Sequence, residues 1–166
     1  HDYYDLIEWA GTQAWSNGRV GLTGVSYLTQ SQWQVAALSP PHLAAINPWE
    51  GWSDIYREVV RHGGIPETRF WGSGYIAGRW GHSTTEIEDL MLETRERPFF
   101  DDYWRSKIAP LADIKVPAYV VASWSDQGLH TRGTLEAFKS ISSQEKWLEV
   151  HGGKKWAHYY QKESLA

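Results

Sequence analysis

Residues 19–28 read RVGLTGVSYL, and this stretch decides the fold predicted for the chain. A short apolar run, typical of a buried parallel strand, ends in Gly24-Val25-Ser26 and turns directly into a helical pattern. A serine on such a sharp turn presents its hydroxyl, and the backbone N–H of the next residue, Tyr27, can face a developing oxyanion. The alternative is a plain strand end at which Ser26 only caps the following helix.

Length and charge favour one domain without a nucleic-acid or membrane partner. The 166 residues are enough for a single sizeable core. The formal charge of −4 comes from 20 acidic and 16 basic residues. The basic residues form no cluster of the kind that binds nucleic acid, so no nucleic-acid partner is expected. No run of 18 apolar residues is present, so no membrane span is predicted.

The absence of cysteine excludes disulfides, thiol catalysis and thiolate metal sites. It does not assign a compartment, although a soluble protein of the cytoplasm is slightly favoured. His42, His62, His82 and His130 show no ligand-like pairing with carboxylates, so we expect no metal site. The chain starts with His1 rather than Met, which indicates processing or truncation.

Helical and strand patterns alternate on both sides of a different middle segment. Apolar residues at spacings of three and four predict helices, and short apolar runs predict strands, as in an α/β parallel sheet. The helices are expected at 2–13, 27–38 and 129–141, and the strands at 19–25, 43–47 (closed by Pro48), 116–123 and 146–150. We therefore divide the chain into a first core part at 1–48, an insertion at 49–112 and a second core part at 113–166.

The insertion at 49–112 is aromatic and rich in glycine, with no further strand expected. It predicts a helix at 55–62, a loop at 63–66, a capping box at 83–86 that opens a helix ending before Pro98, and a short helix at 100–108. Helical inserts of this kind commonly cap an active site. The rings that would suit an apolar substrate pocket are Trp52, Tyr56, Phe70, Trp71, Trp80, Trp104 and, beyond the insertion, Trp124. Ordinary packing between cap and core explains them equally well.

Two further residues stand where a nucleophilic serine needs partners. Asp126 lies three residues past one apolar strand, and His151 directly follows the next. Ser26, Asp126 and His151 thus follow the chain order of α/β-hydrolases, each at the carboxyl end of a strand. Histidine can take the serine proton near neutral pH, and the aspartate holds the imidazole in the required tautomer. His158 is the alternative base, but it sits in a helical pattern.

Other candidates have simpler roles. Asp54 lies in the first helix of the insertion and Asp113 precedes its strand at the wrong end, so neither is preferred as the catalytic acid. The remaining internal histidines are expected to be surface or loop residues: His42, His62, His82 and His130.

Several short sequence motifs of this chain resemble those of one family. This family comprises the serine hydrolases grouped with cocaine esterase, the α-amino-acid ester hydrolases and the X-prolyl dipeptidyl aminopeptidases. The most specific are GVSYL at 24–28 and SWSDQGLH at 123–130. The others are WSNGRVG at 15–21, QW at 32–33, PPHL at 40–43, PWEG at 48–51, GGIP at 63–66 and KWLEVHG at 146–152. Thr29 stands where the family usually has Gly or Ala.

The resemblance implies part of an α/β-hydrolase fold, the C-terminal half of its sheet with a helical cap. It also implies hydrolysis of small-molecule or peptide esters or amides, including X-prolyl bonds, through an acyl-enzyme without a metal or cofactor. Family members are several times longer, and their second oxyanion donor comes from a tyrosine in a part not present here. The alternative function is therefore a truncated, non-catalytic fragment, and the outer edge of strand 19–25 is expected to promote self-association.

Overall fold

The computed structural model describes residues 2–68, 70 and 88–165. These fall into two compact units, one formed by His1–Ser53 with Ile108–Ala166 and the other by Asp54–Lys107. Each unit is described by itself below. The capping box predicted at 83–86, and the residues Trp71, Trp80 and His82, lie outside the described residues.

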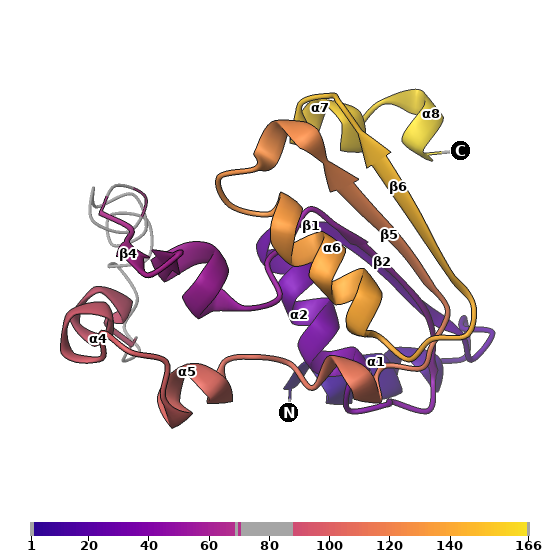
Figure 1. Ribbon diagram of the computed structural model, residues 1–166. Helices are drawn as coiled ribbons and strands as arrows, with labels where there is room; N and C mark the ends of the chain where they lie inside the picture. Colours follow the sequence, from indigo (N-terminus) through magenta and orange to yellow (C-terminus); the bar gives the residue numbers. More distant parts are fainter. Residues whose placement is uncertain (1, 69, 71–87, 166) are drawn as a thin grey trace. The chain divides into compact units, whose positions relative to one another are not determined.

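The first unit contains a parallel four-stranded sheet in the order β1-β2-β5-β6 (Figure 1). The strands are β1 (Val20–Val25), β2 (Leu43–Trp49), β5 (Ala118–Ser123) and β6 (Lys146–His151). All four predicted strands are present, and their parallel pairing confirms the α/β class. In a parallel sheet every carboxyl end lies at the same edge, so the residues that follow these strands are brought together.

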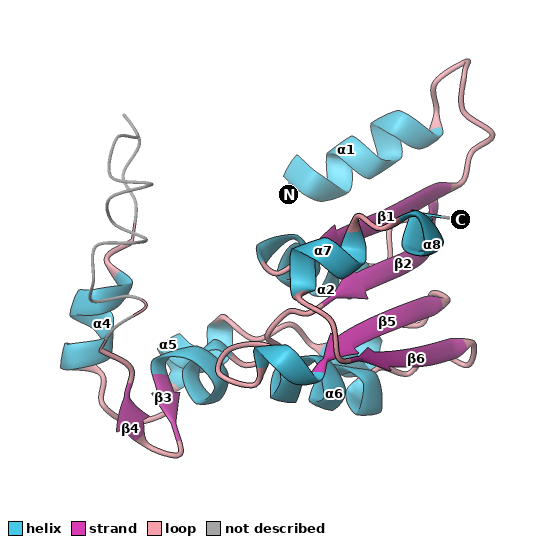
Figure 2. Cartoon of the chain, turned by 90° about the horizontal axis from the view of Figure 1, so that it is seen from above, coloured by secondary structure: helices cyan, strands magenta, loops and turns pink. Residues whose placement is uncertain are grey.

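Three helices cover one face of this sheet: α1 (Asp2–Gly11), α2 (Tyr27–Ala36) and α6 (Thr131–Ser140). Two short helices, α7 (Lys155–Tyr159) and α8 (Lys162–Leu165), lie on the opposite side (Figure 2). Single 3₁₀ turns at Leu111–Asp113 and Trp124–Asp126 precede and follow β5. No helix in the described part of the chain is long and apolar enough to cross a membrane.

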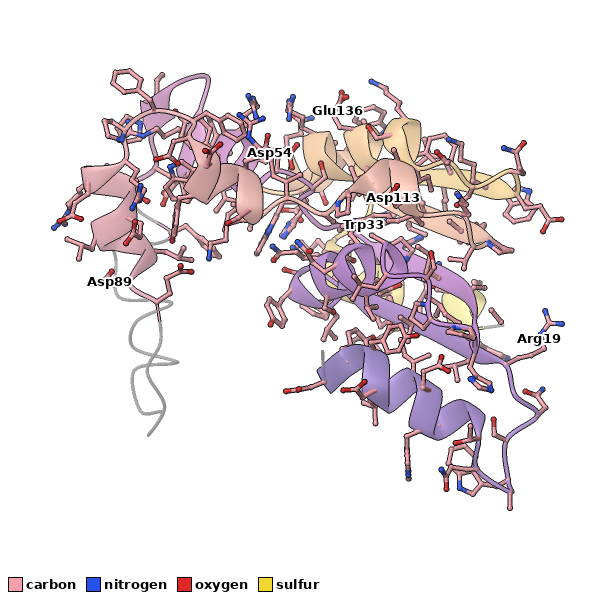
Figure 3. The ribbon with its side chains drawn as sticks, turned by 90° about the horizontal axis from the view of Figure 1, so that it is seen from below. Arg19, Trp33, Asp54, Asp89, Asp113 and Glu136 are labelled. Carbon is pink, nitrogen blue, oxygen red and sulfur yellow. The ribbon has the colours of Figure 1, made fainter. Side chains whose placement is uncertain are left out.

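The main core lies between the sheet and α1, α2 and α6. Trp33 of α2 is 1% exposed and packs with Ile7 of α1 and with Ile46 of β2 (Figure 3). Full burial of one such side chain contributes roughly 1.5–3 kcal/mol. This core fixes the helices against one face, so the positions at the ends of the strands are held by a packed framework.

β1 and β6 are the two edge strands of the described sheet. On β1, Gly21 and Thr23 are exposed, and on the face opposite the main core Tyr119 and Trp147 are also exposed. An edge strand with free backbone groups beside an apolar face favours pairing with another chain. Self-association stays a prediction.

β2 continues through Pro48, so the prediction that this residue closes the strand is wrong. Ile46 N donates to Pro117 O and Glu50 N donates to Val121 O, both on the β5 side. Position 48 lies midway between these donors, and proline has no N–H to offer there. One hydrogen bond of the ladder is missing, but the strand survives because its neighbours bond on both sides of the gap.

The second unit differs more from its prediction. The helix expected at 55–62 is a π-helix at Tyr56–Val60 followed by β3 (Arg61–His62), which pairs antiparallel with β4 (Ile65–Pro66). The expectations of one helix, of a loop at 63–66 and of no further strand are therefore wrong. Gly63 and Gly64 both have positive φ, 59° and 86°, and such a Gly-Gly pair forms the two-residue turn of a hairpin.

The described residues of this unit also contain α4 (Leu90–Glu96) and α5 (Asp102–Ser106). Asp89 caps α4 by accepting from Met91 N and Leu92 N, and Asp101 caps α5 by accepting from Trp104 N. The helix predicted at 100–108 is thus present in a shorter form, because a capping carboxylate fixes its first residue.

Candidate active site

Ser26 occupies a strained turn between β1 and α2. Its φ is 66° and its ψ is −116°, a conformation that L-residues rarely adopt and that costs roughly 1–3 kcal/mol. Ser26 N donates to Trp49 O at 3.0 Å, which ties the turn to β2. The Ser26 side chain makes no capping hydrogen bond to α2, so the plain helix-cap alternative is not what the structure contains. The turn leaves the hydroxyl available to other groups.

Small residues around Ser26 allow the tight turn. A Cβ on Gly24 would lie 2.5 Å from Leu28 Cβ, and a Cβ on Gly51 would lie 2.4 Å from Thr29 Cγ2. Thr29, which differs from the usual small residue of the family, is buried, and its hydroxyl donates to Gly24 O at 2.8 Å. Thr29 is therefore accommodated because its hydroxyl bonds to the backbone beneath the turn, while Gly51 makes room for its methyl group.

The Ser26 hydroxyl is hydrogen-bonded to a histidine that itself contacts an aspartate. Ser26 Oγ lies 3.1 Å from His130 Nε2, and His130 Nδ1 lies 2.5 Å from Asp126 Oδ2. Asp126 ends the 3₁₀ turn after β5, and His130 directly precedes α6. The histidine is 1% exposed and stacks on Trp52, with ring centroids 5.5 Å apart. A serine, a histidine and a carboxylate are thus held in series, as proton transfer from a nucleophilic serine requires.

The turn between Asp126 and His130 creates this contact. Leu129 N and His130 N both donate to Asp126 O, which closes one turn of chain. Thr131 Oγ1 donates to Ser123 O, and Thr134 Oγ1 donates to Gly51 O at 3.0 Å. These bonds attach the start of α6 to the ends of β5 and β2, so His130 cannot move away from the serine turn without breaking them.

Lys155 of α7 adds a positive charge to this cluster. Its Nζ lies 2.7 Å from Asp126 Oδ2 and 2.9 Å from His130 Nδ1. Burial disfavours the Asp126 carboxylate, but the hydrogen bond and charge of His130, and then those of Lys155, outweigh it and lower the pKa of Asp126. Burial lowers the pKa of His130, against the hydrogen bond that His130 donates to Asp126, and the Lys155 charge lowers it further. Near neutral pH the site therefore holds an ionised aspartate and an uncharged histidine.

The predicted base, His151, lies in a second cluster at the end of β6. His151 Nε2 is 3.0 Å from Glu50 Oε1, and its Nδ1 accepts from Gly153 N at 3.2 Å. Its ring stacks on His158, with centroids 3.7 Å apart. In the described part of the chain neither of these histidines hydrogen-bonds to Ser26 or Asp126. The structure brings Ser26 and Asp126 together through His130 instead.

His158, the alternative base, stacks on His151 and is held by two other side chains. Its Nε2 lies 3.0 Å from Glu149 Oε1, and Gln161 Nε2 lies 2.8 Å from its Nδ1. Glu149 also accepts a hydrogen bond from the Tyr119 hydroxyl at 2.7 Å. Both ring nitrogens of His158 are thus used by neighbouring side chains.

The remaining predicted site residues fall in different places. Tyr27 is the first residue of α2, where backbone N–H groups point out of the helix end, so its predicted oxyanion role is compatible with its position. Trp52 is buried against His130, whereas Trp124 is 55% exposed. In the second unit Tyr56 packs on Phe100 and Trp104, and Phe70 N donates to Glu67 Oε1.

The alternative carboxylates do not join the Ser26 cluster. Asp54 pairs with Arg57 Nη1 inside the second unit. Asp113 ends the 3₁₀ turn before β5, at the amino end of that strand (Figure 3). Among the described residues no group of three or more histidines and carboxylates is arranged to hold a metal ion.

His130 is the contact of Ser26 that the sequence analysis does not predict. There it is expected to be an ordinary surface or loop histidine. The available signal was its distance of four residues from Asp126, directly after an apolar strand. One helical turn brings residues four apart onto the same side, so the pair could have been recognised.

These features define the core of an α/β-hydrolase: parallel strands, a strained serine turn after one strand, and a histidine and a carboxylate at the ends of others. Comparison with known proteins agrees. Residues 1–80 match the family model of the X-Pro dipeptidyl-peptidase (S15 family). The chain is 45% identical to cocaine esterase from Rhodococcus sp. (strain MB1 Bresler), over 87% of this chain and 26% of that protein.

Solved structures give the same result. A CocE/NonD family hydrolase from Staphylococcus aureus is 55% identical, with a TM-score of 0.92, over 99% of this chain and 30% of that one. Acetyl xylan esterase from Paenibacillus sp. R4 shares only the fold, at 12% identity and a TM-score of 0.65 over 99% of this chain and 49% of that one. The expected resemblance is confirmed: the chain is similar to the serine hydrolases of the CocE/NonD and S15 group. It spans between a quarter and a third of the length of these close relatives.

Proposed function

We propose that this chain carries the nucleophile and proton-transfer residues of a serine hydrolase that cleaves esters or amides through an acyl-enzyme. The observation that carries the proposal is the series of contacts Ser26 Oγ, His130 Nε2, His130 Nδ1 and Asp126 Oδ2 at the carboxyl ends of β1 and β5. Similarity to a family of serine hydrolases supports the same reaction class.

The proposed reaction has two halves. Ser26 Oγ attacks the substrate carbonyl while the histidine takes its proton, and the charge that develops on the carbonyl oxygen is stabilised by Tyr27 N–H. The histidine then protonates the leaving alcohol or amine, which departs and leaves an ester on Ser26. Water, deprotonated by the same histidine, attacks this ester and releases the acid, which restores the serine.

His130 is the base that the geometry favours, because its Nε2 already faces the serine hydroxyl. General-base catalysis requires Nε2 to be unprotonated and the proton to reside on Nδ1, next to Asp126. His151 and His158 remain candidates from chain order. To act, either would have to leave a carboxylate, Glu50 for His151 and Glu149 for His158.

The substrate class is proposed from the relatives. Cocaine esterase is named for an ester, and the family model is named for X-Pro dipeptides. Both bonds are cleaved at a carbonyl, so one serine mechanism serves either, and the shape of the pocket decides between them. We propose small-molecule or peptide esters and amides, X-prolyl peptides included.

A serine-directed fluorophosphonate tests the proposal. Purified chain is incubated with the probe, and the labelled residue is located by mass spectrometry after digestion. We expect a single adduct on Ser26 that disappears in Ser26→Ala and remains in Ser31→Ala, a matched change on α2. Undiminished labelling in Ser26→Ala would refute the assignment.

The same experiment distinguishes the second candidate, a non-catalytic fragment, from an active hydrolase. A chain that gives the circular dichroism of an α/β protein and unfolds cooperatively, yet leaves Ser26 unlabelled at all pH values, would support it. The observation in its favour is that the chain covers only 26–30% of its close relatives.

A further inference from the structure

Thr29 carries a buried hydroxyl group that the proposed reaction does not use. It lies in the first turn of α2, and its side chain is fully buried. A threonine in a helix usually donates its hydroxyl proton to a carbonyl of the same helix, three or four residues earlier. Thr29 Oγ1 instead lies 2.8 Å from Gly24 O and 2.5 Å from Trp49 O. The hydroxyl therefore connects α2 to the ends of β1 and β2.

The two carbonyl groups that contact Thr29 also flank the serine turn. Gly24 lies two residues before Ser26, and Trp49 O accepts a hydrogen bond from Ser26 N at 3.0 Å. The hydroxyl has a single proton, which the two carbonyls share. Ser26 has a φ of 66°, and such a strained conformation persists only where its surroundings determine it strongly. Thr29 supplies part of that determination.

The other side of the Thr29 side chain packs on Gly51. A Cβ on residue 51 would lie 2.5 Å from Thr29 Cβ and 3.1 Å from Ser26 O. Carbon atoms do not approach so closely, so a side chain can fill this space from residue 29 or from residue 51, but not from both. Gly51 is itself fixed, because Gly51 N donates to Thr134 Oγ1 at 3.1 Å and Gly51 O accepts from the same hydroxyl at 3.0 Å.

We propose that Thr29 is a positioning residue for the nucleophile. Its hydroxyl, bonded to Gly24 O and Trp49 O, and its packing on Gly51 hold the Ser26 turn in the conformation that presents Oγ. This role rests on the proposed function, in which Ser26 attacks the substrate. It does not depend on which histidine takes the serine proton, because the contacts that support it are made to the main chain around the turn and to Gly51.

The first test measures the turn without relying on activity. Exchange of the Ser26 amide proton with solvent is followed by NMR, since this N–H donates to Trp49 O and its exchange reports local opening. Thr29→Ala removes the hydroxyl and the methyl group, and Thr29→Ser restores the hydroxyl alone. We expect exchange roughly tenfold faster in Thr29→Ala, the effect of one lost hydrogen bond, and close to wild type in Thr29→Ser. Equal protection in Thr29→Ala and wild type would overturn the proposal.

The second test measures the consequence for Ser26. Fluorophosphonate labelling at increasing probe concentrations separates the non-covalent binding constant of the probe from the maximal rate of adduct formation. Thr29→Ala should lower the maximal rate roughly 10- to 100-fold, because the nucleophile is misplaced, and Thr29→Ser should recover most of this loss. The binding constant should stay near that of wild type. A loss confined to the binding constant, or the absence of recovery in Thr29→Ser, would overturn the proposal.

Thr94→Ala is the matched control for both measurements. Thr94 is also a buried threonine of a helix, but its hydroxyl donates to Leu90 O of its own helix at 2.7 Å. The same substitution there should leave the labelling rate and the Ser26 exchange rate unchanged. Equal effects of Thr94→Ala and Thr29→Ala would show a general loss of stability and would overturn the positioning role.

A double-variant cycle tests the packing on Gly51. The φ of Gly51 is not positive, so alanine at this position is opposed only by its contacts. Gly51→Ala should accelerate Ser26 amide exchange strongly in the presence of Thr29 and at least tenfold less in the Thr29→Gly background, where the competing side chain is absent. An equal effect in both backgrounds would show that residues 29 and 51 do not compete for one space and would overturn the proposal.

The two proposals fail in different ways. If Ser26 is unreactive in wild type, the proposed function fails, while amide exchange still decides whether Thr29 holds the turn. If Ser26 reacts and Thr29→Ala leaves both the maximal rate and the exchange unchanged, the positioning role fails and the serine mechanism stands. Circular dichroism and thermal unfolding confirm that each variant is folded before it is used.

Discussion

Two histidine clusters lie at the carboxyl edge of the same sheet, one beyond β1 and β5 and the other beyond β2 and β6. They differ in what faces the ring nitrogen that does not contact the carboxylate. In the first, His130 contacts Asp126 through Nδ1 and a serine hydroxyl through Nε2. In the second, His151 contacts Glu50 through Nε2 and a backbone N–H through Nδ1. Both are imidazole–carboxylate pairs, but only the first has a nucleophile on its other side. Chemistry therefore depends on the group opposite the carboxylate, and the pair alone does not identify a base.

The largest expected effect is the ranking of the three histidines. His130→Ala should slow Ser26 labelling by roughly 10⁴-fold or more, as loss of a catalytic histidine does. His151→Ala should cost much less, because its Nε2 faces Glu50 rather than Ser26, and His158→Ala should cost least. The measurement is the second-order rate constant for labelling at pH 7.5 with each variant shown to be folded. A large loss in His151→Ala or His158→Ala with a normal rate in His130→Ala would move the base to the second cluster.

Asp126→Asn should have the next largest effect. The amide cannot hold the proton on His130 Nδ1 as a carboxylate does, so the histidine adopts the wrong tautomer, and about 10⁴-fold of rate is lost in the comparable case. Labelling kinetics measure the loss, and ¹⁵N NMR of histidine should show His130 changing from the Nδ1–H to the Nε2–H form. Glu149→Gln, the matched change in the second cluster, should leave both readouts near wild type. A near-normal rate in Asp126→Asn would show that another carboxylate serves.

The two clusters also show what the sequence could predict. The sequence predicts that Ser26 and Asp126 lie near each other because each follows an apolar strand, and the parallel pairing of the strands brings their ends to one edge. His151 follows a strand equally well, yet strand order does not determine which way a ring points. Its orientation depends on Glu50, which lies 101 positions earlier in the sequence and is buried beside it. Long-range contacts of this kind have no local pattern, so chain order alone does not determine which histidine faces Ser26.

The rest of the fold also contains elements that the sequence pattern predicts and elements that it does not. The sequence predicts α1, α2, α6 and the four strands of the first unit because each presents apolar residues to one core. The hairpin at Arg61–Pro66 was missed because its strands are only two residues long, too short for any periodicity. Its one local signal was the Gly63-Gly64 pair, which a hairpin turn uses for positive φ.

The smallest expected effect is a shift of the pH profile in Lys155→Met. His130 acts as a base only when uncharged. Burial lowers its pKa, the hydrogen bond that it donates to Asp126 opposes this, and the Lys155 charge lowers the pKa further. Removing the ammonium should raise the pKa of His130, so the acid-side loss of labelling should begin at a higher pH. The acid side of the profile should therefore shift to higher pH, with less than a tenfold change at its maximum, since about one pKa unit corresponds to 1.4 kcal/mol. Lys154→Met removes the same charge from the neighbouring exposed residue and should leave the profile in place. If both variants shift the profile equally, the effect is one of net charge, and the contact of Lys155 with Asp126 and His130 has no specific role in the first cluster.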